Sequence, residues 1–162
     1  MNPCRLMQSS DFQRVLSINA ESAPHVAGLN PQELRYILDI GALAWVALSA
    51  ETPTAYLLAI PHSAPYWGEE FQFFQHRLAS FLYIDQVAVA QEHRRQRWGT
   101  ALYQTATQWA RDHRISTLCC EVNVLPSNDT SLRFHRQLGF SGTEQLRTTD
   151  GRRVVLLRNA VN

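Results

Sequence analysis

The sequence predicts a mixed α/β domain in which one β-sheet carries helices on its faces. Three observations lead to this prediction. Strand-like and helix-like segments alternate along the chain, 45% of the 162 residues are hydrophobic against 18% charged, and no repeat or linker rich in Pro, Gly and Ser divides the sequence. We therefore expect residues 1–162 to form a single domain.

The N-terminal part of the chain predicts one strand and two helices. A short strand over residues 4–7 precedes Ser9-Ser10-Asp11, whose side chains are typical of helix N-caps, and apolar residues then recur at helical spacing over residues 12–19. Asn-Pro-Gln-Glu at residues 30–33 combines an N-cap, a proline at the first helical position and a glutamate at the third. Gly41 is expected to end this second helix.

The rest of the chain predicts two hairpins around alternating strands and helices. Apolar runs at residues 42–48 and 55–60 flank the turn-forming residues 51–54 and predict a β-hairpin, and residues 61–78 are expected to form a loop rich in aromatic side chains. The elements expected after this loop are a strand over 81–90, a helix over 99–113, a strand over 117–124, a helix over 128–138, and strands over 140–147 and 153–157 joined at Asp150-Gly151.

The charge balance excludes a protein that binds nucleic acid through its bulk charge. The 15 basic residues are all arginine and face 14 acidic ones, so the formal net charge is +1. The chain has 3 cysteines, with Cys119 and Cys120 adjacent and no metal-ligand spacing, which favours a reducing compartment and no metal site. Residues 1–6 hold no apolar signal core, and no apolar run approaches the ~18 residues that span a membrane. We therefore expect a soluble, cytoplasmic protein without a membrane partner.

One segment joins a predicted strand directly to a predicted helix and is strongly basic. It contains Arg94, Arg95 and Arg97 just before Gly99. Such a junction directs unpaired backbone N–H groups and the positive end of a helix toward one place, which suits a phosphate or pyrophosphate group. Guanidinium groups also bind phosphate oxygens in a bidentate manner. The alternative interpretation is a solvated basic turn. A small nucleic-acid-binding site is a further interpretation, with less support.

The segment Arg94-Arg95-Gln96-Arg97-Trp98-Gly99 resembles the acyl-CoA loop of the GCN5-related N-acetyltransferases, Arg/Gln-x-x-Gly-x-Gly/Ala. Arg97 stands where the family has its first glycine. Residues 128–140 resemble the later family motif, Asn-x-x-Ala-x-x-Leu/Phe-Tyr-x-x-x-Gly-Phe, at its full spacing. There Ser131 replaces the alanine and His135 replaces the tyrosine. The resemblance covers residues 81–140, and the flanking elements agree in order only.

The resemblance implies a fold and a cofactor. The fold would be a mixed, centrally splayed β-sheet of about six to seven strands flanked by about four helices. Acetyl-CoA would lie between the splayed strands at residues 81–90 and 117–124, with the backbone of residues 87–89 holding the pantetheine arm and the thioester carbonyl. The residues expected to bind it are Val87, Ala88, Val89, Arg94, Arg95, Gln96, Arg97, Trp98, Gly99, Thr100, Asn128, Ser131, Phe134 and His135.

Two kinds of catalytic group are expected. Helical spacing places Asn128, Ser131 and His135 on one face, and His135 occupies the position of the tyrosine that protonates the departing thiolate in the family. A helix histidine that is bonded to the backbone and takes no part in the chemistry is the alternative. Glu121, in a segment similar to the Glu-Val-Arg of ribosomal-protein alanine acetyltransferases, is the first candidate for the base, and Asp85 is the second. Either carboxylate could instead be bound by backbone or arginine.

The resemblance implies direct transfer of an acetyl group to the primary amine of a small-molecule or peptide acceptor. Aromatic side chains are expected to border the acceptor site, namely Tyr66, Trp67, Phe71, Phe74 and Tyr83. A small core under the loop, or a homodimer contact, is the alternative for these aromatics. Because two signature positions hold Arg97 and His135, a non-catalytic sensor that binds acyl-CoA is a second hypothesis for the chain.

Overall fold

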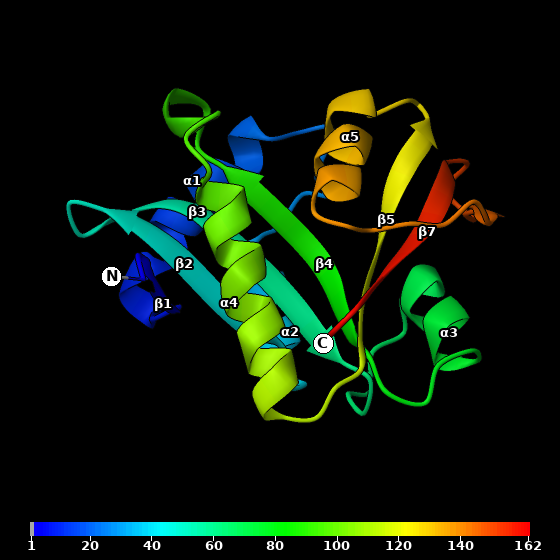
Figure 1. Ribbon diagram of the computed structural model, residues 1–162. Coiled ribbons are helices and arrows are strands. Elements are labelled where there is room, and N and C mark those ends of the chain that lie inside the picture. Colours follow the sequence, from blue (N-terminus) through cyan, green and yellow to red (C-terminus); the bar gives the residue numbers. More distant parts are fainter. Residues whose placement is uncertain (1) are drawn as a thin grey trace.

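The computed structural model describes residues 2–162 and contains one seven-stranded sheet with helices on both faces (Figure 1). The predicted mixed α/β fold is thus confirmed. The strands run in the order β1-β2-β3-β4-β5-β7-β6. Their bounds are β1 Cys4–Leu6, β2 Leu43–Ser49, β3 Thr52–Pro61, β4 Leu82–Val89, β5 Thr117–Leu125, β6 Gln145–Arg147 and β7 Arg153–Ala160. The helices are α1 Phe12–Glu21, α2 Pro31–Asp39, α3 Glu69–Gln75, α4 Trp98–Asp112 and α5 Asp129–Gln137.

The centre of the sheet opens between β4 and β5. These two strands form the only parallel pair of the described chain, and they pair only at Leu82 with Leu118 and at Tyr83 with Cys119. Beyond Tyr83 the strands diverge, and α5 lies over the widening gap (Figure 1). The divergence leaves one side of β4 without a neighbouring strand, as the sequence resemblance implied.

A β-bulge in β4 changes which side chains share a face. Gln86 pairs with Leu58 of β3 and Ile84 pairs with Ala59, so Asp85 is an extra residue between them. A strand without a bulge would place Asp85 and Gln86 on opposite faces. Here the Asp85 side chain reaches Tyr66 and the Gln86 side chain reaches Asn19, both on the side of the sheet covered by α1 and α3.

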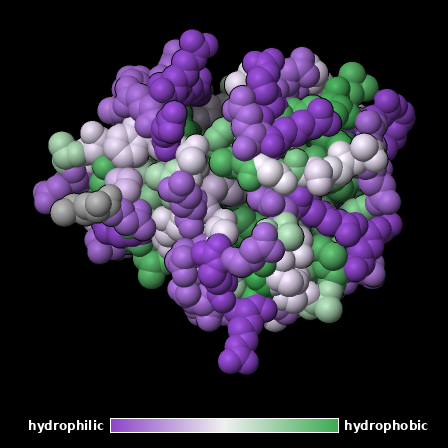
Figure 2. Space-filling model, viewed as in Figure 1, coloured by the Kyte–Doolittle hydropathy of each residue, from purple (hydrophilic) through white to green (hydrophobic). Residues whose placement is uncertain are grey.

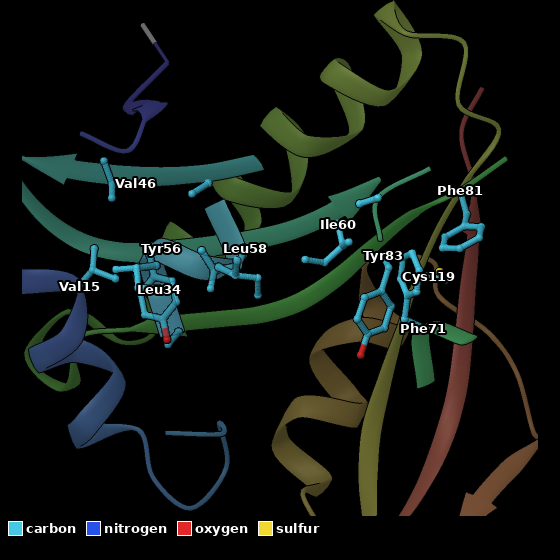
Figure 3. Packing of buried hydrophobic residues seen from close by; sticks show 14 of the residues in the cluster. Val15, Leu34, Val46, Tyr56, Leu58, Ile60, Phe71, Phe81, Tyr83 and Cys119 are labelled. Atoms are coloured by element: carbon cyan, nitrogen blue, oxygen red, sulfur yellow. The ribbon is translucent and has the colours of Figure 1, made fainter. Parts of the chain in front are cut away.

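Two layers of apolar side chains cover the two faces of the sheet. One contains Val15 and Leu34 of α1 and α2 with Phe71 of α3, packed against Tyr56, Leu58 and Tyr83 of the sheet (Figure 3). The other contains Leu102 and Ala106 of α4, packed against β2, β3 and β5. The buried residues of α4, at positions 99, 102, 103, 106 and 110, follow the 3.6-residue helical period and fix which face of that helix meets the sheet.

The segment expected to be a loop contains a fifth helix, which corrects the prediction for residues 61–78. Helix α3 begins after Gly68, with Glu69 and Glu70 in its first turn where acidic groups favour the helix dipole. Phe71 and Phe74 are both fully buried and lie on its inner face. The helix has only 7 residues, so its hydrophobic period is short and is hard to separate from an aromatic-rich loop.

Two hairpins also differ from their predicted bounds. Ala50 and Glu51, both with positive φ, form the turn between β2 and β3, so Thr52 already belongs to β3 and the expected turn at residues 51–54 was placed too late. In the last hairpin β6 begins at Gln145, and residues 140–144 do not form a regular ladder but meet β7 through an isolated bridge between Ser141 and Arg158.

Candidate active site

A cavity of about 550 Å³ occupies the gap where β4 and β5 diverge. Ile84–Val87 of β4 and Cys120–Asn123 of β5 form its two sides, directly after the last paired residues of each strand. Helix α5 contributes side chains from one face of the sheet, and α2 and α3 contribute from the other. The cavity therefore passes between the two sheet faces, which gives two reactants separate ways to approach the same point.

The edge of β4 that faces the cavity lacks a strand partner. Val87, Ala88 and Val89 pair with β3 on one side, but β5 pairs with none of them. Backbone N–H and C=O groups on such an edge are available to an amide-containing ligand, which can pair with the strand as another strand would. The structure thus places these three predicted cofactor-binding residues beside the gap, with only Val87 in the cavity lining.

The arginine-rich loop lies at the N-terminal end of α4. Arg94, Arg95 and Arg97 are exposed, and none of them forms an ion pair with another residue in the part of the chain that the structure describes. Arg95 and Arg97 have φ values of 64° and 66°, in the left-handed region that usually favours glycine. Arg97, the departure from the family motif, therefore adopts the conformation that a glycine would supply, and it adds a positive charge.

The space-filling view shows how the loop relates to α5. Hydrophilic residues cover the loop before α4 and the outer surface of α5, and a notch separates the two (Figure 2). Under the notch the helices touch closely, since a side chain at Gly99 would meet the ring of Phe134 at 3.1 Å. Gln96 accepts a hydrogen bond from the Trp98 indole, and Thr100 continues the first turn of α4. These predicted cofactor-binding residues therefore lie together at one end of the gap.

The inner face of α5 lines the cavity with the three residues that helical spacing placed together. Asn128, Ser131 and His135 all border it, and the Asn128 side chain caps the helix by accepting the N–H of Ser131. Gly139, with φ of 101°, then lets the chain reverse so that Phe140 packs against His135. The family-like motif thus fixes both the start and the end of this helix.

His135 has hydrogen-bond partners at both ring nitrogens. Its Nδ1 lies 2.7 Å from the carbonyl oxygen of Ser131, which can only accept, so Nδ1 carries the proton. Nε2 then accepts the hydroxyl proton of Tyr103 at 2.6 Å. Burial lowers the pKa of His135, so the ring is neutral near pH 7. These contacts match the alternative stated above, a histidine bonded to backbone; its role as an acid stays a prediction.

Two tyrosine–carboxylate pairs lie at the point where the strands separate. Tyr83 of β4 donates a hydrogen bond to Oε2 of Glu121 at 2.6 Å, and Tyr66 donates one to Oδ1 of Asp85 at 3.0 Å. Burial raises the pKa of Glu121 well above its ordinary value, and the nearby Glu70 carboxylate adds to this effect. Burial also raises the pKa of Asp85, to about 6. Asp85 can therefore bind and release a proton near neutral pH, and Glu121 holds its proton more tightly than an ordinary glutamate does.

An ion-paired cluster that the sequence analysis did not find closes one side of the cavity. Arg152, just before β7, donates to Glu70 of α3 at 3.2 Å, to Asn123 of β5 at 3.1 Å and to Asp150 at 2.9 Å. Glu70 is 82 positions away from Arg152 in the sequence, and only the packing of α3 against the sheet brings them together. The one local signal for this cluster was the pair of acidic residues at the start of α3, and it was missed because residues 61–78 were predicted to form a loop.

The segment between α1 and α2 forms another part of the wall that the sequence did not indicate. Residues 24–29 line the cavity beside Glu33, Tyr36 and Ile37 of α2. This segment carries no charged side chain and no motif, so its position depends on long-range contacts alone. It lies on the same side of the sheet as the Tyr66–Asp85 pair.

The predicted acceptor-site aromatics separate into three groups. Tyr66 and Tyr83 line the cavity through their hydroxyl ends. Phe71 and Phe74 are fully buried and pack edge-on or tilted against Tyr83, so they support the wall from behind without lining it. Trp67 is 79% exposed and lies outside the lining. The two phenylalanines thus occupy the small-core position that was the alternative interpretation.

Two general features of the described chain bear on the kind of site. Within residues 2–162 no three His, Cys, Asp or Glu side chains gather as metal ligands would. In the same range, no helix combines the length and the apolar character needed to cross a bilayer. The buried thiols also have raised pKa values, because burial at Cys119 and Cys120 disfavours the thiolate.

Comparison with known proteins identifies the family. The model of the acetyltransferase (GNAT) family matches residues 13–140, which is most of the chain, and the protein belongs to this family. A search of curated proteins finds no sequence match. The family membership confirms the resemblance that the two motifs indicated.

Solved structures share the fold across nearly the whole chain at low sequence identity. The ribosomal-protein-S18-alanine N-acetyltransferase from Escherichia coli has a TM-score of 0.72 and 17% identity, covering 100% of this chain and 95% of that one. NAA60 from Arabidopsis thaliana in complex with a bisubstrate analogue has a TM-score of 0.78 and 13% identity, covering 98% and 97%. The protein smu.2055 from Streptococcus mutans has a TM-score of 0.78 and 16% identity, covering 98% and 99%.

Proposed function

We propose that this protein transfers an acetyl group from acetyl-CoA to the primary amine of an acceptor. The observation that carries the proposal is the cavity between β4 and β5, which is lined by two carboxylates and by part of an unpaired strand edge. The basic loop before α4 follows that strand edge in the chain and lies outside the lining. One NAA60 structure holds acetyl-CoA, which supports the choice of donor. Acetyl-CoA would supply an activated acyl group in the form of a thioester.

The residues present fit the chemistry of acetyl-CoA. Its phosphates match the exposed guanidinium groups of Arg94, Arg95 and Arg97 next to the N-terminus of α4, which form no ion pair among the described residues. Its amide-containing arm matches the free edge of β4 at residues 87–89, where backbone N–H groups can donate to a carbonyl oxygen. Ser131 is small and leaves room beside Asn128 at the inner face of α5. These groups would bind and orient the donor.

A carboxylate is proposed to take the proton from the acceptor amine. Glu121 is the first choice, because it lies on β5 two residues after the last residue that pairs with β4 and because it lines the cavity. Asp85, with a pKa of about 6, is the second. Cys120 also lines the cavity, but its raised pKa disfavours a nucleophilic thiolate, which supports direct attack by the amine.

His135 is proposed as the group nearest to the departing thiol, with one condition. Its Nδ1–H is committed to the carbonyl of Ser131 and its Nε2 accepts from Tyr103, so Nε2 must first take up a proton from solvent and give up the Tyr103 bond. It then passes that proton to the departing thiolate, and the ring returns to its neutral form. If His135 has only a structural role, folded His135→Ala protein will have the same turnover rate as wild-type protein.

The acceptor end of the cavity favours an amine that arrives as a cation. The lining includes Glu33, Glu70, Asp85, Glu121 and Asp150 against the single arginine Arg152, which is already paired. Such an excess of carboxylates attracts an ammonium group from solution before it loses its proton. Both a small amine and the N-terminus of a peptide carry that group, so both belong among the acceptors tested.

A thiol-release assay with acetyl-CoA tests the proposal. The amine panel contains a peptide with N-terminal alanine, spermidine and a free amino acid. Wild-type protein is compared with Glu121→Gln, Asp85→Asn and, as a control outside the cavity, Glu144→Gln. We expect Glu121→Gln to lower kcat at least a hundredfold and to abolish the rise of rate with pH, since general bases contribute about 10²–10⁴-fold. Glu144→Gln should retain full activity.

Two outcomes would contradict this assignment. An unchanged pH limb in Glu121→Gln removes Glu121 from the mechanism, and loss of the limb in Asp85→Asn alone transfers the role to Asp85. Tight acetyl-CoA binding without turnover on any amine favours the alternative function, a sensor that binds acyl-CoA.

A further inference from the structure

The α1–α2 segment, residues 24–29, has few means of its own to hold its shape. Residues 26–29 form no hydrogen bond to other backbone groups of the described chain. Val26 and Leu29 are only partly buried against the core, and Ala27 and Gly28 are exposed. A cavity wall built from such a segment needs contacts from elsewhere to keep one conformation.

Two buried amide side chains supply these contacts. Asn19 of α1 is 2% exposed; its Nδ2 donates to the carbonyl oxygen of Ala27 at 2.9 Å, and its Oδ1 accepts the N–H of Leu29 at 2.9 Å. Gln86 of β4 is 7% exposed, and its Nε2 donates to the same carbonyl of Ala27 at 3.0 Å. The two side chains thus hold the segment on both sides of Gly28.

A third buried group, the Tyr56 hydroxyl, forms hydrogen bonds with both amides. The Tyr56 hydroxyl donates to Oε1 of Gln86 at 2.8 Å and accepts from Nδ2 of Asn19 at 3.0 Å. Asn19 Nδ2 also lies 3.2 Å from Oε1 of Gln86. Tyr56 makes no bond to the segment, and the two amides keep their direct contact with each other and their bonds to the segment without its hydroxyl.

Gln86 also connects this network to the site. It follows the bulged residue Asp85 directly, and it lines the cavity together with Asp85 and the α1–α2 segment. This wall lies on the sheet face opposite α4 and α5, which carry the groups that fit acetyl-CoA. A ligand that touches it is therefore the acceptor and not the donor.

We propose that Asn19 and Gln86 are positioning residues that hold the α1–α2 segment as the acceptor-side wall of the cavity and thereby set the affinity for the amine. The proposal rests on the acetyl-transfer function proposed above. Loss of either side chain releases the carbonyl of Ala27 or the N–H of Leu29 and lets the wall take other conformations. Only a fraction of the molecules then has the conformation that binds the acceptor, so the apparent KM for the acceptor rises.

The experiment compares Gln86→Leu and Asn19→Ser with Tyr56→Phe, a matched control that removes a hydroxyl from the same network but no bond to the segment. The first measurement is hydrogen exchange of the Leu29 amide, which Asn19 protects directly. We expect at least tenfold faster exchange in Asn19→Ser and little change in Tyr56→Phe. Unchanged exchange in Asn19→Ser overturns the proposal.

The second measurement is steady-state kinetics with the best amine of the panel. We expect Gln86→Leu to raise KM for the amine about tenfold and to leave KM for acetyl-CoA unchanged, with Tyr56→Phe like wild type. Equal changes in both KM values, or the same effect in Tyr56→Phe, overturn the proposal, because general destabilisation produces them. If wild-type protein acetylates no amine, the proposed function fails, while the exchange measurement still decides whether the two side chains hold the segment.

Discussion

At the scale of single residues, the site contains carboxylates whose burial is unfavourable for folding. Asp85 has no cationic partner among the described residues; its one side-chain partner is the Tyr66 hydroxyl. Its pKa is raised to about 6 from an ordinary value of 3.8 by burial. A group held in this way destabilises the fold at the pH where it is ionised, and such groups cluster where proton transfer is needed.

The expected consequence is a pH-dependent gain of stability in Asp85→Asn. Folded protein binds the proton of Asp85 more tightly than unfolded protein does, so the stabilising protonated form is present below about pH 4 and is lost as pH rises through about 6. Asparagine keeps an acceptor for Tyr66 without the charge. At pH 8 the variant should be more stable by about 1–3 kcal/mol, and the difference should vanish near pH 3.5.

Thermal unfolding of both proteins between pH 3.5 and 8 measures this effect. A difference that stays constant over the whole range would show that the charge of Asp85 is not its cause. Glu144→Gln, at an exposed carboxylate, serves as the control and should show no such trend.

At the scale of elements, local sequence signals determined some parts of the structure well. The motifs at residues 94–99 and 128–140 act within one loop and one helix, so α4, α5 and the loop before α4 follow from them directly. The buried face of α4, which includes Leu102, Ala106 and Ala110, follows the helical period. By contrast, α3 is short, and its two buried phenylalanines lie in a segment that is aromatic throughout.

The parts of the site that the sequence did not reveal depend on distant partners. Arg152 and Glu70 carry no motif, and Asn19 and Gln86 are ordinary polar residues of a helix and a strand until the fold brings them to the α1–α2 segment. The tautomer of His135 likewise depends on its hydrogen bond with Tyr103. The helical pattern shows only that Tyr103 is buried, not that it bonds His135. Hydrogen bonds between residues far apart in the sequence cannot be predicted from the local spacing of apolar and polar residues.

The arginine loop gives a prediction at this scale. Arg97 has a left-handed φ of 66°, which costs a non-glycine residue about 1–2 kcal/mol. Glycine removes that strain but adds about 0.5–1 kcal/mol of chain entropy in the unfolded state. Arg97→Gly should therefore be as stable as wild type or more stable by up to about 1 kcal/mol, while its affinity for acetyl-CoA falls several-fold at low salt because one phosphate-binding cation is gone.

Arg114 offers the matched control for this variant. It is exposed, has a φ of 58° and lies just past the other end of α4. Arg114→Gly should show the same change in Tm and no change in acetyl-CoA affinity measured by calorimetry. Equal affinity of Arg97→Gly and wild type at low salt would remove Arg97 from the binding site.

At the scale of the whole molecule, the sheet is two units joined by a narrow junction. The strands β1–β4 on one side and β5, β7 and β6 on the other share only two residue pairs, at the closed end of the gap (Figure 1). Helices that pack across both parts complete the connection. A ligand that pairs with the free edge of β4 and contacts α5 would bridge the two units.

Acetyl-CoA should therefore stabilise the entire molecule measurably. At a concentration of 100 times Kd it should add about 2.7 kcal/mol, a shift in Tm of about 5–10 °C for a chain of this size. The shift should shrink in 1 M NaCl, because the exposed arginines of the loop are then screened. A shift that is the same at both salt concentrations would indicate binding without contribution from Arg94, Arg95 and Arg97.

The bulge in β4 makes the site sensitive to the length of the strand. Because Asp85 is the extra residue, removing it would restore a regular alternation beyond Ile84, yet every later residue of the strand would keep its own pairing with β3. The carboxylate of the second base candidate would disappear while Gln86 stayed at the α1–α2 segment. Deletion of Asp85 would thus separate two properties that neighbouring positions of β4 combine: the proposed proton acceptor would be lost, and the proposed anchor of the acceptor-side wall would remain.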